Sequence, residues 1–179
     1  SSDVCSSDLL DRLPENRNFL SPLNFKFQIM KSPTVDFFLQ AVNIPGFSLS
    51  PVEVSNPFVK IPYSGEHIDF EDLQISFKVD EDLVNYMEIY DWIRDLGFPN
   101  KFDEYKTVAA KPVTSGLGIT SDISLLILSS SRNPKYNCVF KDAFPVRLSG
   151  INFNTTSEDV NFIEAQATFK YRIFEIEKI

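Results

Sequence analysis

Apolar and polar residues alternate along much of this chain, and this period of two predicts β-strands. Phe25, Phe27 and Ile29 are separated by single polar residues, so their side chains fall on one face of an extended segment. Residues 73–79 show the same pattern and form the clearest half-buried strand. Residues 163–173 carry the longest alternation, which predicts one long C-terminal strand, as in the wall of a barrel.

Shorter apolar runs bounded by turn residues predict further strands. Residues 35–44 form an extended run that ends at a Pro-Gly turn, and residues 123–128 are apolar on both faces. Residues 136–140 follow a hairpin turn, and residues 144–151 add a short strand. The pattern therefore predicts a mainly β fold, an antiparallel β-barrel or sandwich with one flanking α-helix.

Residues 47–63 contain Pro51, Pro57 and Pro62 among β-forming residues. Proline cannot donate to the ladder of a central strand, so this segment predicts an exposed arm or an edge hairpin. We expect the dipeptide Ser64-Gly65 to close it.

Between Asp80 and Gly97 the spacing of apolar residues changes from that of a strand to that of a helix. Asp80 is the expected N-cap, and Gly97 with the following Phe-Pro ends the helix. Its apolar residues recur at spacings of three and four and predict a single buried stripe. The stripe consists of Leu83, Tyr86, Met87, Tyr90 and Ile93. Residues 100–120 lack periodicity and are expected to form a long loop.

Composition sets the class of protein. The chain has 179 residues, of which 43% are apolar, and this suits a single domain, which we assign to residues 10–179. No segment has the roughly 20 consecutive apolar residues of a membrane helix. The net charge of −8 disfavours binding to phosphate backbones, although DNA could pass such a surface without sticking. Residues 1–9 match the translation of a sequencing adapter, so we interpret them as an artefact and exclude them from the fold.

Residues for catalysis or metal binding are scarce. The single histidine, His67, lies in an expected turn, and no nucleophile motif accompanies it. Cys5 and Cys138 with one histidine cannot supply four zinc ligands. Residues 80–82 are acidic, but helix capping accounts for them, and the glycines near residue 117 lack a nucleotide-binding context. We therefore expect no catalytic, cofactor or metal site, and no enzyme.

The order of these elements, with several local motifs, resembles the tail-tube family of contractile phages, which is related to the type VI secretion tube protein. The motifs are Asn-Phe-x-Phe at residues 24–27, Gln-Ala-x-x-Ile-Pro-Gly at 40–46, Ile-Pro-Tyr-Ser-Gly at 61–65, Asp-Phe-Glu-Asp-Leu at 69–73 and the helix motif Asp-Trp-Ile around Trp92. The resemblance covers residues 18–179. It departs from the family in the longer loop at residues 101–121 and in the extended arm.

The resemblance implies a structural virion protein that forms stacked hexameric rings of the inner tail tube, a conduit for DNA ejection. Its arm would contact a neighbouring subunit or ring through Val52, Val54, Phe58, Val59 and Ile61. The polar face of the C-terminal strand would approach the lumen through Glu164, Gln166, Thr168 and Lys170. Edge strands would become the joints between subunits.

The implied partners are copies of the chain itself, the tail sheath, baseplate and tail-terminator proteins, and passing genomic DNA that is not bound specifically, with no membrane and no cofactor. The implied location is the phage tail, assembled in the bacterial cytoplasm. Alternatives within the same fold are a baseplate tube initiator, a tail-terminus ring, or a secreted tube protein of a bacterial injection system. A monomeric ligand-binding barrel is the alternative of another class.

Overall fold

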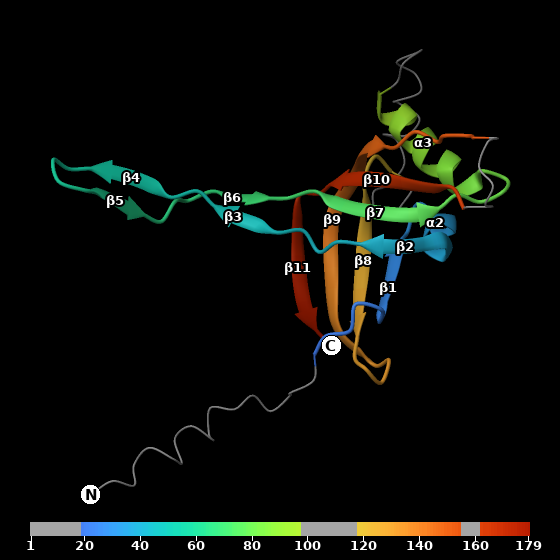
Figure 1. The fold of residues 1–179 in the computed structure, drawn as a ribbon, viewed down its shortest axis with the longest axis horizontal. Helices are drawn as coiled ribbons and strands as arrows, with labels where there is room; N and C mark the ends of the chain where they lie inside the picture. The colour runs from blue at the N-terminus through green and yellow to red at the C-terminus, as the bar shows by residue number, and fades with distance from the viewer. Residues whose placement is uncertain (1–18, 98–117, 155–161) are drawn as a thin grey trace, which may run out of the picture.

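A computed structural model describes residues 19–97, 118–154 and 162–179, in which one bent antiparallel sheet forms an open barrel (Figure 1). The sheet has 7 strands in the order β1-β8-β9-β10-β7-β2, and β11 also pairs with β9. The strands are β1 (Phe25–Ile29), β2 (Leu39–Val42), β7 (Leu73–Lys78), β8 (Ser121–Leu128), β9 (Pro134–Leu148), β10 (Glu164–Lys170) and β11 (Ile173–Lys178). β1 and β2 are the two ends of this path, and within the described residues they do not pair with each other. The predicted antiparallel β class is confirmed.

The long strand β9 bends the sheet into two layers. Its first part pairs with β8 and β11, and its last part pairs with β10. We call β11-β9-β8-β1 layer A and β9-β10-β7-β2 layer B; the strands of layer B cross those of layer A in Figure 1. The bend lies at Asp142, which has a φ of 55° and whose carboxylate lies 2.9 Å from Nε of Arg172.

This bend corrects two predicted boundaries. The strands expected at residues 136–140 and 144–151 are one strand, β9. The single strand expected over residues 163–173 is instead β10, which ends at Lys170, followed by β11 in the other layer. The alternation continues past Lys170, but Tyr171 and Arg172 turn the chain from layer B into layer A.

The core lies between the layers, and helix α3 (Val84–Gly97) packs against it. Trp92 is 1% exposed, and its ring lies 5.9 Å from that of Phe169 on β10. Its indole Nε1 donates to the carbonyl of Ile119 at 2.9 Å. The tryptophan therefore fixes the helix to the sheet through one apolar contact and one hydrogen bond.

The start and the buried stripe of this helix differ from the prediction. Residues 80–83 form a turn in which Leu83 has a φ of 57°, so the helix begins at Val84 and not after Asp80. The carboxylate of Asp80 accepts from the amide of Glu81, next to it, and its carbonyl accepts from the amide of Leu83 in the turn. The fully buried residues of the helix are Asn85, Ile89 and Trp92, whereas the predicted Leu83, Met87 and Tyr90 are exposed. Asn85 is buried because its amide donates to the carbonyl of Lys78 at 2.7 Å.

A second, short helix replaces the first part of the extended run predicted at residues 35–44. Helix α2 (Pro33–Phe38) precedes β2 and buries Val35. Proline at the first helical position with Ser32 before it is a helix-start signal that the apolar pattern obscured.

The predicted arm is confirmed and is longer than expected. It consists of two successive ladders, β3 (Phe47–Leu49) with β6 (Ile68–Phe70), and β4 (Val52–Ser55) with β5 (Lys60–Tyr63). Figure 1 shows it projecting away from the barrel. Its turn lies at residues 56–59, so Ser64-Gly65 does not close it but lies between β5 and β6. A Cβ on Gly65 would lie 1.8 Å from the carbonyl oxygen of Ser50, which explains the glycine there.

None of the helices in the described part of the chain combines the length and the apolar character needed to cross a bilayer.

Candidate assembly surfaces

The outer half of the arm has one apolar and one polar face. In its ladder Val52 lies opposite Tyr63 and Val54 opposite Ile61, so these four side chains share one face. The other face carries an ion pair, with Nζ of Lys60 3.1 Å from a carboxylate oxygen of Glu53. All of the arm residues predicted as an interface are exposed, including Val59 at the turn.

The tip of the arm presents a phenylalanine to solvent. The side-chain oxygen of Asn56 accepts from the amides of Phe58 and Val59 at 2.9 and 2.8 Å, which fixes the turn. Phe58 is 96% exposed. An isolated two-stranded hairpin is marginally stable in water. An apolar arm of this kind is therefore stabilised when a partner covers it.

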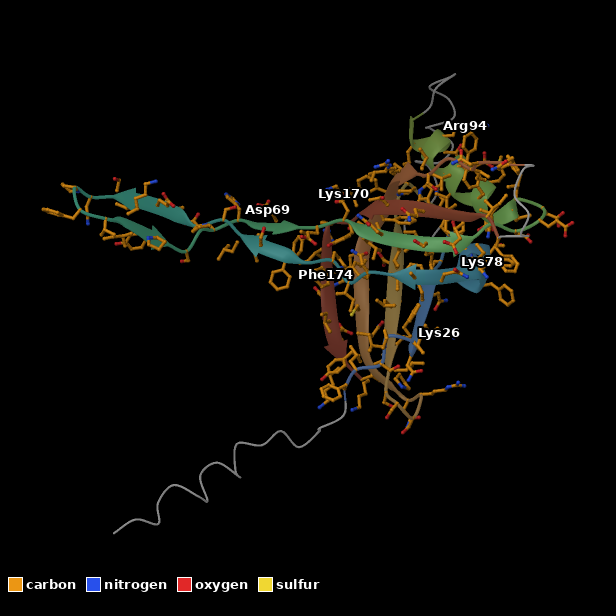
Figure 2. All side chains as sticks on the ribbon, viewed as in Figure 1. Lys26, Asp69, Lys78, Arg94, Lys170 and Phe174 are labelled. Carbon is orange, nitrogen blue, oxygen red and sulfur yellow. The ribbon has the colours of Figure 1, made fainter. Side chains whose placement is uncertain are left out.

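Aromatic rings join the root of the arm to β11. The ring of Phe174 lies 6.3 Å from that of Phe47 and 5.6 Å from that of Phe70, at the two strands of the root. Phe174 also stacks on Phe140 of β9 at 5.5 Å (Figure 2 labels Phe174 at the base of the arm). The hydroxyl of Tyr171 donates to the carbonyl of Glu71 at 2.8 Å, and burial with the nearby acidic residues raises the pKa of Tyr171 to about 12. The outer part of the arm is thus free while its root is held.

Layer A ends in two edges, β1 and β11, on opposite sides. The hydrogen bonds to β8 and β9 show which residues of β1 and β11 point their backbone N–H and C=O groups away from the sheet. The carbonyl of Asn24 accepts from Leu128 on β8, so Phe25 and Phe27 point their backbone groups away from β8. The amide of Ile179 donates to Lys135 on β9, so Phe174 and Ile176 point theirs away from β9. Such edges are available for pairing with another chain.

Helix α2 occupies one end of the β1 edge. The amide of Ile29 donates to both carboxylate oxygens of Asp36, at 2.9 and 3.1 Å, and its carbonyl accepts from Ser32. Burial raises the pKa of Asp36 to about 7, the hydrogen bond from Ile29 opposes this, and the charge of Glu88 adds to it. The outward backbone groups of β1 therefore stop at Phe27.

The raised pKa of Asp36 predicts a pH dependence of stability. The folded state binds this proton more tightly than the unfolded chain, whose carboxyl has a pKa near 3.8. The contribution to the free energy of unfolding is therefore complete below pH 4 and is lost as the pH rises to about 7. We expect Asp36→Asn, which still accepts from Ile29, to remove this component. Denaturant titrations from pH 4 to 8 should show the wild type losing stability relative to the variant; parallel curves would contradict it.

The predicted lumen residues share the solvent face of β10. Glu164, Gln166 and Lys170 are exposed and Thr168 is half-buried, while the intervening residues belong to the core. Glu164 lies opposite Lys78, and Lys170 forms an ion pair with Asp72 at 2.5 Å. Figure 2 labels Lys78 and Lys170, which come from neighbouring strands. This face is polar with charges of both signs.

Reactive groups do not gather in the part of the chain that the structure describes. It contains no cluster of three or more His, Cys, Asp or Glu able to hold a metal ion. Cys138 is fully buried, and burial raises the pKa of its thiol. His67 stands on the arm just before β6. Residues 1–9, with Cys5, and most of the predicted 100–120 loop lie outside the described residues.

Solved structures with a similar fold include chains of the anti-feeding prophage and of an extracellular contractile injection system. A chain in the cryo-EM structure of the anti-feeding prophage cap, its tube-terminating cap, matches with a TM-score of 0.58 and 12% identity, over 94% of this chain and 97% of that chain. A chain in the 6-fold symmetrised baseplate of the same prophage matches with a TM-score of 0.57 and 12% identity, over 86% and 90%. The chain has the tail-tube fold. The resemblance seen in the sequence is thus confirmed at the level of the fold.

A chain in the extended sheath–tube complex of the extracellular contractile injection system PVC also has the tail-tube fold, with a TM-score of 0.55, 12% identity, and coverage of 99% of this chain and 100% of that chain. No protein-family model matches the sequence, and no curated protein matches it significantly. These neighbours come from structures of a baseplate, a tube-terminating cap and a sheath–tube complex.

The sequence pattern located the arm, but it did not show which strands form the edges of the sheet, and it did not reveal the aromatic root of the arm. The outward edges of β1 and β11 depend on which strands pair with them, and no local pattern carries that information. The aromatic root could have been suspected from Phe70, Tyr171 and Phe174, which stand at the ends of alternating runs.

Proposed function

We propose that this chain is a structural subunit of the inner tube of a contractile tail or injection machine, in which hexameric rings stack into a conduit for DNA ejection. The observation that carries the proposal is the two-faced arm, whose apolar face and Phe58 tip are exposed in the single subunit. The two outward edges of layer A add a means of joining subunits side by side.

In this proposal the strand edges and the arm form different contacts between subunits. Layer A joins neighbours within a ring, because strands added at β1 and β11 extend one sheet. The arm reaches a neighbour or the next ring through Val52, Val54, Phe58, Val59 and Ile61. Sheath, baseplate and terminator proteins are the expected partners, the assembled tail is the expected location, and genomic DNA passes without specific binding, in line with the net charge of −8.

Two solvent-facing sides of the sheet are candidates for the wall of the lumen. The face of β10 with Glu164, Gln166, Thr168 and Lys170 remains the predicted one. The face of layer A that points away from the core is the second, because it would be continuous around a ring joined through β1 and β11. Its polar residues are Lys26, Gln28, Ser124, Asn137, Lys141, Glu175 and Glu177, and the apolar Leu126 and Val139 lie among them.

A baseplate tube initiator or a tail-terminus ring is the second candidate function. The similarity to chains in a baseplate and in a tube-terminating cap favours it, and all of these roles require ring assembly. A monomeric ligand-binding barrel remains the alternative without assembly.

Assembly of the purified full chain tests the proposal. Negative-stain microscopy and sedimentation across a range of concentrations should show ring-sized particles for either ring function and stacked filaments for the repeated tube. A stable monomer at every concentration would contradict both ring functions and favour the monomeric barrel.

A further inference from the structure

We propose that β11 of one copy pairs antiparallel with β1 of the next, with Phe25 opposite Ile176 and Lys26 opposite Glu175 of the second copy, an inference that rests on the proposed ring assembly. The directions of the strands allow it. Each neighbouring pair in β11-β9-β8-β1 is antiparallel. A second copy that places its β11 beside β1 therefore continues the antiparallel alternation.

The end of β1 limits how far an incoming strand can pair. Asp36 and Ser32 already occupy the amide and the carbonyl of Ile29, so an incoming strand can pair only as far as Phe27 and Gln28. β11 begins at Ile173. In the register that pairs the most residues within this limit, the first residue of β11 stands opposite Gln28, and Phe174 stands opposite Phe27. A shift by two residues would place Phe174 against helix α2.

Apolar side chains match on the core side of this joint. Ile176 is 54% exposed in the single subunit. β1 borders a groove between itself and α2 whose apolar lining includes Leu23, Phe25, Phe37 and Leu39. Phe37 is 83% exposed. In the proposed register Ile176 of the second copy lies over this groove, so exposed apolar groups on both edges are covered together.

Charges match on the opposite face. Lys26 points away from the core on β1, and Glu175 and Glu177 do so on β11. Lys26 then faces Glu175 of the second copy directly, with Glu177 at the diagonal position. Glu175 also pairs with Lys141 of its own chain at 2.7 Å, so the joint has alternating charges. This complementarity identifies the occupant of the edge as a second copy.

Disulfide cross-linking tests the register. Residues whose backbone groups point away from each other across an antiparallel pair are close enough for a disulfide. In a Cys5→Ser background, Lys26→Cys/Glu175→Cys should give a ladder of covalent multimers on non-reducing gels. Gln28→Cys/Glu177→Cys, on the same strands and face but four residues out of register, should give none. A ladder from the mismatched pair alone, or from neither pair, would overturn the register.

Charge reversal tests the joint without cysteines. Lys26→Glu should raise the concentration for half-maximal ring formation about fivefold, because it places like charges opposite each other. Arg94→Glu, the same change of charge on α3, should stay within about twofold; Figure 2 labels both residues. Equal effects would overturn the joint. Wild-type rings without a matched ladder would overturn this joint and leave ring assembly intact, whereas absence of wild-type rings would overturn both.

Discussion

Trp92→Ala is expected to lower the free energy of unfolding by about 3–5 kcal/mol, the usual range for removing a large buried aromatic side chain. The indole is 1% exposed, contacts the ring of Phe169, and donates to the carbonyl of Ile119. The substitution leaves a cavity between α3 and β10 and removes the donor to that carbonyl. Denaturant unfolding followed by circular dichroism measures the change.

Met87→Ala is the matched control for Trp92→Ala. It lies on the same helix, but its side chain is exposed. We expect it to change the free energy of unfolding by no more than about 0.5 kcal/mol, as for most surface substitutions. Equal losses in the two variants would contradict the assignment of Trp92 as the anchor of α3. The comparison also tests which face of the helix is buried, because the sequence pattern predicted Met87 to be part of that face.

The sequence predicted the elements whose structure is set locally. β1 and β7 alternate strictly, and each has one face in the core and one in solvent, so a period of two was sufficient. The arm was predictable because its prolines are compatible with an exposed hairpin and not with a central strand. In both cases the burial pattern and the backbone preference agree.

Elements set by tertiary contacts were predicted poorly. In α3 the predicted Tyr86 and Ile93 do pack against the core. The polar residue Asn85 is buried to bond Lys78, while the apolar Met87 and Tyr90 remain exposed, so hydrophobicity located the buried face only in part. The alternation across Tyr171 hides a corner, because both β10 and β11 are half-buried strands with the same period. Only the pairing of each with β9 separates them into two layers.

Of the candidate assembly surfaces, the arm was predictable from local sequence, whereas the strand edges depend on tertiary pairing. The arm residues were identified from their β propensity and the surrounding prolines, and all of them proved exposed. The edge residues Phe25 and Ile176 look like ordinary strand residues in the sequence. Their availability follows from the hydrogen bonds of Asn24 and Ile179, which show the side of each strand that is already paired.

Val54→Asp combined with Phe58→Asp is expected to abolish stacking of rings while leaving the subunit folded. Both side chains are exposed, so the fold does not depend on burying them. In a stacked contact each would lose about 1.5–3 kcal/mol of apolar burial, and each new carboxylate would also have to be desolvated. Because 1.4 kcal/mol corresponds to a tenfold change in an equilibrium constant, the association constant for stacking should fall more than about hundredfold. Electron microscopy should show single rings in place of filaments.

Ser55→Asp is the control for this pair, because Ser55 lies on the polar face of the arm, opposite Lys60. It adds a carboxylate to the same hairpin without entering the apolar face, and filaments should persist. Circular dichroism and the thermal midpoint of both variants should match the wild type. Loss of the fold in the double variant would instead place Val54 and Phe58 among residues the subunit needs for stability. Filaments of normal length in the double variant would exclude the arm as the stacking contact.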